Sequence, residues 1–290
     1  MRVLITGASG QVGRALLSTI PARAEARGVT REQLDVSDKE AVNRAVSDFI
    51  PAVVINAAAY TAVDRAESDA AAAEAVNAAG PRHLAEAVRK INGARLIQLS
   101  TDYVFDGLNP APHMPRDPTN PANVYGRTKL SGEQAVRDVL ESKAVVLRSA
   151  WIYAAEGKNF LLTMLRLMRE HGAVRVVSDQ RGAPTAAASV ARALWRIVEL
   201  PAINGVLNWT DGGTASWYEF ACAIAEDALA AGLLKKAPVV TAISTSEYPT
   251  PARRPPNSVL DLRESLIRLK LRPTPWRESL RTTLGEMARN

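Results

Sequence analysis

A glycine-rich turn near the start of the chain restricts the fold more than any other feature of the sequence. The run GASGQVG at residues 7–13 joins a short apolar run at residues 2–6 to a helical pattern at residues 11–20. In such a turn Gly7 allows a tight bend, Gly10 lets the backbone approach a pyrophosphate, and Gly13 lets the helix pack closely on a sheet. The free N–H groups at the start of the helix can bind phosphate oxygens. The turn therefore predicts a dinucleotide-binding unit, with a plain strand–helix connection as the alternative.

The first half of the chain alternates between short apolar runs and amphipathic helical patterns. Further strands are expected at residues 52–55, 94–99 and 144–147, and helices at residues 39–49, 81–91 and 125–140. The strands are continuous apolar runs, as in parallel sheets that are covered on both faces. The alternation predicts an α/β fold with a doubly wound, Rossmann-type parallel sheet over residues 1–150.

The second half is less regular and is predicted to form a smaller mixed α/β substrate-binding domain over residues 151–290, with some segments returning to the Rossmann sheet. Helices are expected at residues 160–171, 188–200, 217–231 and 276–288, and strands at residues 174–177, 206–209 and 239–242. Pro-rich stretches at residues 110–121 and 249–256 predict long loops, which in compact proteins often bind ligands or cover sites.

The composition excludes several classes of protein. Apolar residues make up 47% and charged residues 23%, as in folded globular proteins rather than disordered chains. No apolar run approaches the roughly 20 residues that span a bilayer, and the start is not a signal peptide, so we expect a cytoplasmic protein with no membrane partner. Cys222 is the only cysteine and the histidines are scattered, so no metal site is expected. Asp64 and Glu67 are expected to cap a short helix that opens at the capping-box sequence starting at Thr61.

The end of the chain is basic. From Arg253 onward, nine Lys and Arg residues stand against four Asp and Glu residues. Such a surface can bind nucleic acid, a small diphosphate or only solvent. No nucleic-acid recognition module is visible, so nucleic acid is not expected as a partner. Arg253 and Arg254 lie in a proline-bounded loop that can present a guanidinium group to a diphosphate, unless they form a solvated pair.

The segment that should bind an adenosine ribose carries arginines instead of the usual acid. The second strand is expected near residues 22–29, which are poorly apolar and are not followed directly by Asp or Glu at residues 30–31. Arg23, Arg27 and Arg31 can pair with a 2′-phosphate, which favours NADPH over NADH, unless they are ordinary surface residues. The next plausible acid, Asp35, is expected to flank the adenine.

Tyr125 and Lys129 lie four residues apart at the start of a predicted helix, so their side chains share one face. The pKa of a phenol is about 10, and a nearby ammonium group should lower it toward the working pH. Tyr125 can then protonate a carbonyl oxygen while a nicotinamide delivers hydride, and Lys129 can hold the cofactor ribose. Thr101 follows the strand at residues 94–99, at the edge where ligands bind, and its hydroxyl can bind the substrate oxygen. A hydroxyl that only caps the strand end is the alternative.

Together these motifs resemble those of the extended short-chain dehydrogenase/reductases that act on nucleotide sugars, and most closely the dTDP-4-dehydrorhamnose reductase family. The resemblance spans nearly the whole chain, and its last segment is the most characteristic of this family. The matching segments are residues 7–13 (GASGQVG), 56–64 (NAAAYTAVD), 100–105 (STDYVF), 123–129 (NVYGRTK), 151–153 (WIY), 159–160 (NF), 179–185 (DQRGAPT) and 248–255 (YPTPARRP).

The resemblance implies NAD(P)H-dependent reduction of the C4 ketone of dTDP-4-dehydro-β-L-rhamnose to dTDP-β-L-rhamnose, the last step of dTDP-L-rhamnose biosynthesis. It implies that Tyr125 is the proton donor, Lys129 its partner and Thr101 the hydroxyl that tunes it. Sugar contacts are implied for Thr101, Asp102 and Trp151. The alternative for Trp151 is that its indole packs in the core. The family often has His at the position of Tyr60. Cofactor contacts are implied for Gly10, Gln11, Val12, Asp35, Val36, Ala59, Tyr60 and Thr61.

Three alternatives concern assembly and activity. Some family members dimerise around Mg²⁺ held by glutamates, one of them just after the glycine turn, where this chain has Arg14. Bound Mg²⁺ is therefore not expected, and both a monomer and a homodimer stay open.

A nucleotide-sugar epimerase or dehydratase of the same fold would regenerate its cofactor, but epimerases usually lack the segments at residues 101–105 and 248–255. A regulatory subunit, like the homologue that serves methionine adenosyltransferase, would not need Thr101, Tyr125 and Lys129.

Overall fold

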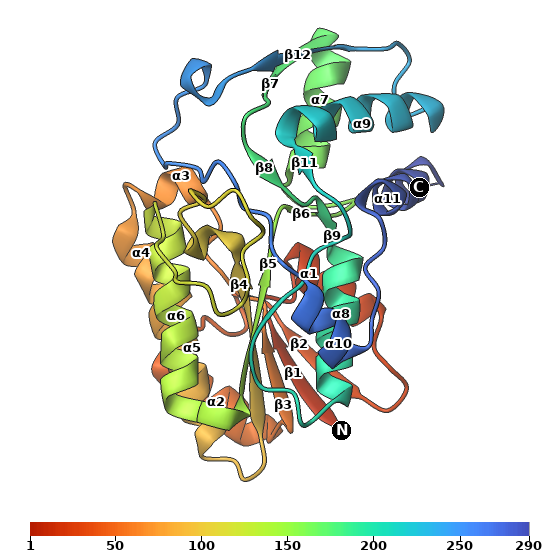
Figure 1. Ribbon diagram of the computed structural model, residues 1–290. Coiled ribbons are helices and arrows are strands. Elements are labelled where there is room, and N and C mark those ends of the chain that lie inside the picture. The colour runs from red at the N-terminus through yellow and green to blue at the C-terminus, as the bar shows by residue number, and fades with distance from the viewer. Residues whose placement is uncertain (290) are drawn as a thin grey trace.

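The computed structural model describes residues 1–289, and its larger lobe is built on a six-stranded sheet (Figure 1). The order across the sheet is β10-β5-β4-β3-β1-β2, and all neighbouring strands are parallel. The doubly wound Rossmann-type sheet predicted from the sequence is confirmed. The strands are β1 (Arg2–Thr6), β2 (Glu25–Val29), β3 (Val53–Asn56), β4 (Arg95–Thr101), β5 (Ala144–Ser149) and β10 (Gly205–Asn208).

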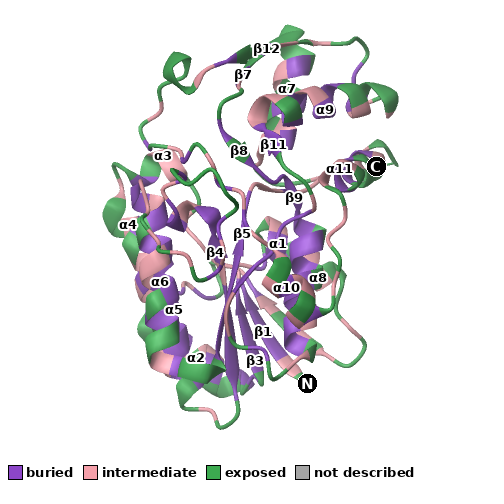
Figure 2. Ribbon diagram, viewed as in Figure 1, coloured by how far each residue is buried: buried purple, intermediate pink, exposed green. Residues whose placement is uncertain are grey.

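Helices cover both faces of this sheet (Figure 1). One layer contains α2 (Lys39–Phe49), α5 (Gly80–Arg89) and α6 (Val124–Leu140), and the other contains α1 (Gln11–Ser18), α8 (Ala187–Glu199) and α10 (Arg263–Leu269). Alternate residues of one strand therefore enter different cores: Leu4 and Val54 pack under the first layer, and Ile5 and Ile55 under the second. This is why the central strands are apolar throughout and appear buried along their length in Figure 2.

The strand order places β1 between β2 and β3, so the winding of the chain reverses at β1. Open parallel sheets bind ligands outside the carboxyl ends of their strands at such a point. Residues beyond 150 also enter this lobe, because β10 pairs with β5 and α8 packs against α1. The second half of the chain thus contributes to both lobes.

The smaller lobe has its own apolar core, around the buried Tyr153 and Phe220. Its strands form three pairs: β6 (Ile152–Tyr153) with β9 (Thr185–Ala186), β7 (Ala173–Val177) with β12 (Val239–Ile243), and β8 (Arg181–Gly182) with β11 (Ala215–Ser216). Its helices are α7 (Phe160–His171), α9 (Trp217–Ala230) and α11 (Trp276–Arg289). None of the helices within residues 1–289 is long and apolar enough to cross a bilayer.

Short helices and turns complete the two lobes, and one of them, α3 (Val63–Ala66), corrects the capping prediction. The helix α3 begins after Ala62 with no side-chain cap, and Asp64 instead binds a segment far along the chain, described below. The other short elements are α4 (Ala70–Glu74), the π-helical turn η1 (Ala75–Ala79), and the 3₁₀ turns η2 (Asp102–Val104), η3 (Glu141–Lys143) and η4 (Thr245–Glu247).

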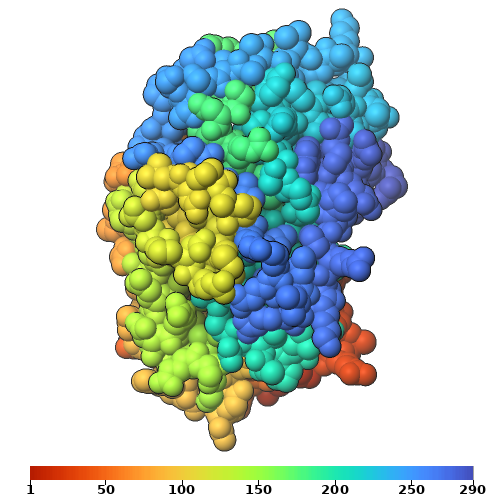
Figure 3. Space-filling model, viewed as in Figure 1, coloured from red at the N-terminus to blue at the C-terminus, as the bar shows by residue number. Residues whose placement is uncertain are grey.

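The Pro-rich loop at residues 110–121 contacts the segment that follows the other Pro-rich loop. In Figure 3 the segment near residue 110, drawn in yellow, packs beside the segment near residue 260, drawn in blue. A β-bridge between His113 and Leu260 joins them. His113 also stacks on Phe105, with ring centroids 4.3 Å apart, so this loop is anchored to the end of β4.

Candidate active site

A cavity of about 920 Å³ lies at the carboxyl edge of the sheet and is lined by residues of both lobes. Its walls combine the ends of β1, β3, β4 and β5 with the start of α6. The structure brings most residues predicted from the sequence to this cavity: Gly7, Gly10, Gln11, Val12, Asp35, Val36, Ala59, Tyr60, Thr61, Thr101, Asp102, Tyr125, Lys129 and Trp151.

The glycine turn forms one wall, and its shape depends on the absence of side chains. Gly7 has a φ of +69°, and a β-carbon there would stand 2.6 Å from the backbone nitrogen of Ala58. A β-carbon on Gly13 would stand 2.2 Å from the carbonyl oxygen of Gly7, so Gly13 packs against the turn and does not itself line the cavity. No side chain caps α1 at Gly10. The first N–H groups of α1 are therefore available, and the turn fits a pyrophosphate.

Two contacts join the glycine turn to the smaller lobe. Asn159 Nδ2 donates a hydrogen bond to Gln11 Oε1 at 2.8 Å, and Arg14 Nε lies 3.2 Å from Glu156 Oε1. Arg14, at the position expected to be glutamate in the Mg²⁺-binding family members, is thus paired with an acid of its own chain. Within residues 1–289 no group of three or more His, Cys, Asp or Glu side chains could hold a metal ion.

At the adenosine end, only one of the three candidate arginines reaches the cavity. Arg31 and Asp35 both line it, with Arg31 Nε 3.6 Å from Asp35 Oδ2. The hydrogen bond from the Ser37 hydroxyl holds the pKa of Asp35 below its ordinary value. Arg23 and Arg27 do not line the cavity, and the Arg27 guanidinium lies over the Phe49 ring.

Tyr60 is held in place by a side chain that the sequence did not single out. Asn77 Oδ1 accepts a hydrogen bond from the Tyr60 backbone nitrogen at 2.8 Å, and Asn77 Nδ2 donates to the Tyr60 carbonyl oxygen at 3.1 Å. The Tyr60 hydroxyl donates to Asp69 at 3.1 Å. Because Asn77 Nδ2 also donates to Thr128 Oγ1, this wall is linked to the helix α6, which carries Tyr125 and Lys129.

The start of α6 is fixed tightly against β4. Asn123 Oδ1 caps the helix by accepting from the Gly126 nitrogen at 2.8 Å, which sets the first turn that carries Tyr125. A β-carbon on Gly126 would stand 2.1 Å from the Tyr103 carbonyl oxygen, so only glycine allows this approach. One turn further, Lys129 Nζ donates to the Leu99 carbonyl oxygen at 2.7 Å. Tyr125 and Lys129 therefore share the cavity-facing side of α6, as their spacing predicted.

The pKa values of this pair differ from the sequence-based expectation. Burial raises the pKa of Tyr125 to about 12, although its hydrogen bond with Thr101 acts in the opposite direction. Lys129 is not among the groups that shift it, and the expected lowering by the ammonium group is therefore wrong for this structure. Burial lowers the pKa of Lys129 itself to about 8, and Glu133, one turn away, opposes that change. The phenol is thus a protonated acid at neutral pH.

Three buried polar atoms of cavity-lining residues make no hydrogen bond of good geometry: Ser100 Oγ, Asp102 Oδ2 and Ser149 Oγ. The Ser258 hydroxyl lies close enough to Asp102 to oppose the rise in its pKa but not to satisfy Oδ2. The other oxygen of Asp102 accepts from Thr101 Oγ1 at 2.9 Å. Burial raises the pKa of Asp102 to about 6. Buried polar atoms in native proteins are nearly always hydrogen-bonded, so these three atoms favour a polar ligand beside Tyr125.

Trp151 lies on the cavity wall but is also packed on one face. Its indole stacks on Trp217, with ring centroids 3.5 Å apart and planes 5° from parallel. A β-carbon on Gly182 would stand 2.3 Å from Trp151 Cε2. The φ of Trp151 is +48°, in the left-handed region. This conformation is costly for residues other than glycine and is found mainly at functional sites.

Besides the packed Gly13, one predicted site residue does not line the cavity, and that residue is Arg253. Its side chain is exposed and does not line the cavity, because the adjacent Arg254 is the one that turns inward. Residues that sequence reasoning missed include Tyr103, Ser149, Phe160 and Trp217, all of which line the cavity. Ser149 was accessible to prediction, because it ends β5 at the ligand-binding edge. Trp217 had no local signal, since it reaches the site from α9 of the smaller lobe.

A doubly wound sheet, a GxxGxxG turn and a Tyr–Lys pair on one helix beside a Thr hydroxyl define an NAD(P)-dependent short-chain dehydrogenase/reductase. The family model described as "RmlD substrate binding domain" matches residues 1–289. The chain belongs to the dTDP-4-dehydrorhamnose reductase family.

Individual relatives agree with this assignment. A dTDP-4-dehydrorhamnose reductase from Burkholderia thailandensis is 42% identical, over 96% of each chain. The crystal structure of a dTDP-4-dehydrorhamnose reductase from Clostridium acetobutylicum is 37% identical and has a TM-score of 0.91, with 99% of each chain covered. A Bacillus anthracis dTDP-4-dehydrorhamnose reductase in complex with NADP is 33% identical and also has a TM-score of 0.91, with 98% of this chain and 99% of that chain covered.

Proposed function

We propose that this chain reduces the C4 ketone of dTDP-4-dehydro-β-L-rhamnose to dTDP-β-L-rhamnose with NAD(P)H, the final step of dTDP-L-rhamnose synthesis. The observation that carries the proposal is the convergence of Thr101, Asp102, Tyr125 and Lys129 on one wall of a cavity whose other wall is the glycine turn. Membership of the reductase family indicates the identity of the substrate. The partner is thus a dTDP-sugar rather than nucleic acid.

The side chains divide the reaction between them. Bound NAD(P)H supplies the hydride that reduces the ketone carbon. Tyr125, protonated at neutral pH, donates its proton to the ketone oxygen as negative charge develops there. The Thr101 hydroxyl, which lowers the pKa of Tyr125, stabilises the resulting phenolate by turning its proton from Asp102 to the phenolate oxygen. Lys129, held by the Leu99 carbonyl oxygen one turn along α6, is placed to bind the cofactor ribose. Asp102, Ser100 and Ser149 offer their unpartnered oxygens to the hydroxyl groups of the sugar.

A coupled assay tests this function directly. The purified chain is given the 4-keto sugar, made from dTDP-4-dehydro-6-deoxyglucose by the upstream epimerase, with NADPH or NADH. Stoichiometric loss of NAD(P)H absorbance with formation of dTDP-rhamnose is expected. An epimerase or dehydratase would convert the sugar with no net loss of reduced cofactor, and a non-catalytic subunit would leave both unchanged.

For the cofactor, we propose a preference for NADPH that rests on Arg31. This guanidinium lies at the adenosine end of the cavity, and its Asp35 partner is 3.6 Å away, which leaves it able to pair with a 2′-phosphate. The substitution Arg31→Ala is expected to lower kcat/KM for NADPH roughly tenfold, the scale of one charged hydrogen bond, and to leave that for NADH unchanged. Equal losses with both cofactors would contradict this role.

A further inference from the structure

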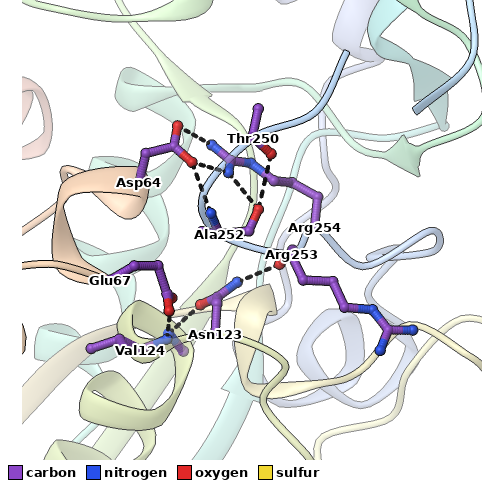
Figure 4. Close-up of polar contacts among 9 residues, drawn as sticks. Asp64, Glu67, Asn123, Val124, Thr250, Ala252, Arg253 and Arg254 are labelled. Carbon is purple, nitrogen blue, oxygen red and sulfur yellow. Dashed lines mark hydrogen bonds and ion pairs between the residues drawn. The ribbon is translucent and has the colours of Figure 1, made fainter. Parts of the chain in front are cut away.

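The loop at residues 249–256, called the strap below, returns from the smaller lobe to the larger lobe beside the catalytic helix (Figure 4). It leaves η4 of the smaller lobe and ends where residues 257–260 bridge to residues 113 and 181. Four of its eight residues are prolines, which restrict its backbone. Ala252 and Pro255 are buried, so the strap is packed into the fold rather than free in solvent.

A guanidinium–carboxylate pair fixes the strap to α3. Arg254 Nη2 donates to Asp64 Oδ2 at 2.7 Å, and Arg254 Nη1 contacts Asp64 Oδ1 (Figure 4). The same carboxylate accepts a hydrogen bond from the Ala252 nitrogen at 3.2 Å, and Arg254 Nη1 donates to the Ala252 carbonyl oxygen at 2.7 Å. The ion pair is thus bidentate, and the backbone of Ala252 in the strap hydrogen-bonds to both partners, which gives the pair a defined geometry.

The strap and α3 both hold the first turn of α6. Asn123, whose Oδ1 caps that turn, donates from Nδ2 to the Arg253 carbonyl oxygen at 2.8 Å. Glu67 Oε1 accepts from the Val124 nitrogen at 2.7 Å. The backbone N–H groups of Val124 and Gly126, on either side of Tyr125, are therefore bound by Glu67, which follows α3, and by Asn123, which also contacts the strap.

A second route runs through Tyr103. The Arg254 guanidinium lies close enough to lower the pKa of the Tyr103 phenol, although burial raises that pKa overall. The Tyr103 ring meets Tyr125 edge-on, with centroids 5.9 Å apart and planes at 79°. Arg254 thus reaches Tyr125 both through the backbone of α6 and through an aromatic side chain that lines the cavity.

We infer that Asp64 and Arg254 are positioning residues for the reaction: their ion pair fixes the strap against α3 and thereby sets the place of the Tyr125 phenol in the cavity. This inference rests on the proposed function for the identity of the proton donor. Neither residue lines the cavity, so their effect on turnover acts through Asn123, Tyr103 and Tyr125.

The test compares the parent with Arg254→Ala, Asp64→Asn and the conservative Arg254→Lys. Arg254→Ala and Asp64→Asn are expected to lower kcat roughly 10- to 100-fold, the scale for misplacing a reacting group by about 1 Å, while the NADPH Kd changes less than about twofold. Arg254→Lys, which keeps the charge, should recover part of the loss. The matched control is Arg166→Ala, which breaks the exposed Arg166–Glu170 pair on α7. If Arg254→Ala does not fold, Asp64→Asn and Arg254→Lys carry the test.

A titration without substrate separates this inference from the proposed function. Ultraviolet difference titration, with Tyr125→Phe as the blank, reports the pKa of the Tyr125 phenol. Arg254→Ala is expected to lower that pKa, because loosening the strap admits water to a phenol whose pKa burial raises. Unchanged kcat and an unchanged phenol titration in folded Arg254→Ala and Asp64→Asn would overturn the inference. A parent protein without reductase activity would overturn the proposed function instead, and the titration would still decide the role of the strap.

Discussion

The two ends of the cavity are built in different ways. The pyrophosphate wall comes from one continuous stretch, residues 7–13, and uses backbone atoms that glycines leave accessible. The sugar wall gathers side chains from β4, α6, β5 and α9, which are far apart in the sequence. A local wall of backbone can be recognised from a short motif, whereas an assembled wall depends on the topology of the whole chain. Substitutions at the two ends should therefore have separable effects on cofactor binding and on turnover.

The largest effect is expected at the assembled wall. Tyr125→Phe removes the proton donor and keeps the ring, so turnover should fall ~10²- to 10⁴-fold, the usual contribution of general acid catalysis. NAD(P)H affinity should stay nearly constant, because the glycine turn is untouched. Steady-state kinetics and cofactor fluorescence titration measure the two quantities. Tyr248→Phe, at a tyrosine that is 60% exposed, is the matched control. Near-normal turnover of Tyr125→Phe would remove this tyrosine from the mechanism.

The local wall is tested by Gly13→Ala. The added β-carbon would stand 2.2 Å from the Gly7 carbonyl oxygen, so the turn must shift. Overpacking of this kind costs about 1–3 kcal/mol, and NADPH affinity is expected to weaken roughly 10- to 100-fold. Gly285→Ala in α11 is the control, because its β-carbon would meet only Arg289 at 3.7 Å. If Gly13→Ala bound NADPH as tightly as the parent, the close packing of the turn would not govern affinity.

A third prediction uses pH to probe the sugar wall. Burial raises the pKa of Asp102 to about 6, so its carboxylate gains a proton as the pH falls through about 6. It can then no longer accept at both oxygens, one hydrogen bond from Thr101 and one from a ligand. The KM for the sugar should therefore rise below that pH while the NADPH Kd stays level. Asp102→Asn should raise KM about tenfold at neutral pH and abolish the acid-side dependence. Asp48→Asn on the exposed side of α2 is the control, and a pH profile identical to the parent in Asp102→Asn would exclude this assignment.

The sequence predicted the parts of the molecule that local signals control. The helix bounds at residues 39–49 and 160–171 agree with the structure to the residue, because Asp38 and Asn159 cap the starts and Ile50 and Gly172 end the helices in the left-handed conformation. The poorly apolar β2 forms within the expected residues 22–29, and the structure places it at the edge of the sheet. The glycine turn and the Tyr125–Lys129 spacing are equally local, and both reach the cavity.

Long-range contacts were not predictable in this way. Asp64 has the spacing of a helix cap, yet it binds Arg254, 190 positions along the chain. Trp217 enters the site only because α9 packs under Trp151. The pKa of Tyr125 likewise depends on how deeply the fold buries it, and the spacing to Lys129 does not determine burial.

The smallest effect is expected from substituting Arg253, the arginine that the sequence analysis assigned to the site. Arg253 and Arg254 are identical neighbours in one proline-rich run, and only the fold distinguishes them: Arg254 is held by Asp64, whereas the Arg253 side chain is exposed and Arg253 contributes its carbonyl oxygen to Asn123. Arg253→Ala keeps that carbonyl, so KM for the sugar and kcat should both stay within about twofold of the parent, as at most surface positions. Kinetics of the two alanine variants, measured side by side, check this. A rise in KM confined to Arg253→Ala would support the diphosphate contact that was expected from the sequence. It would show that the strap binds the substrate through the Arg253 side chain, which is exposed in this structure.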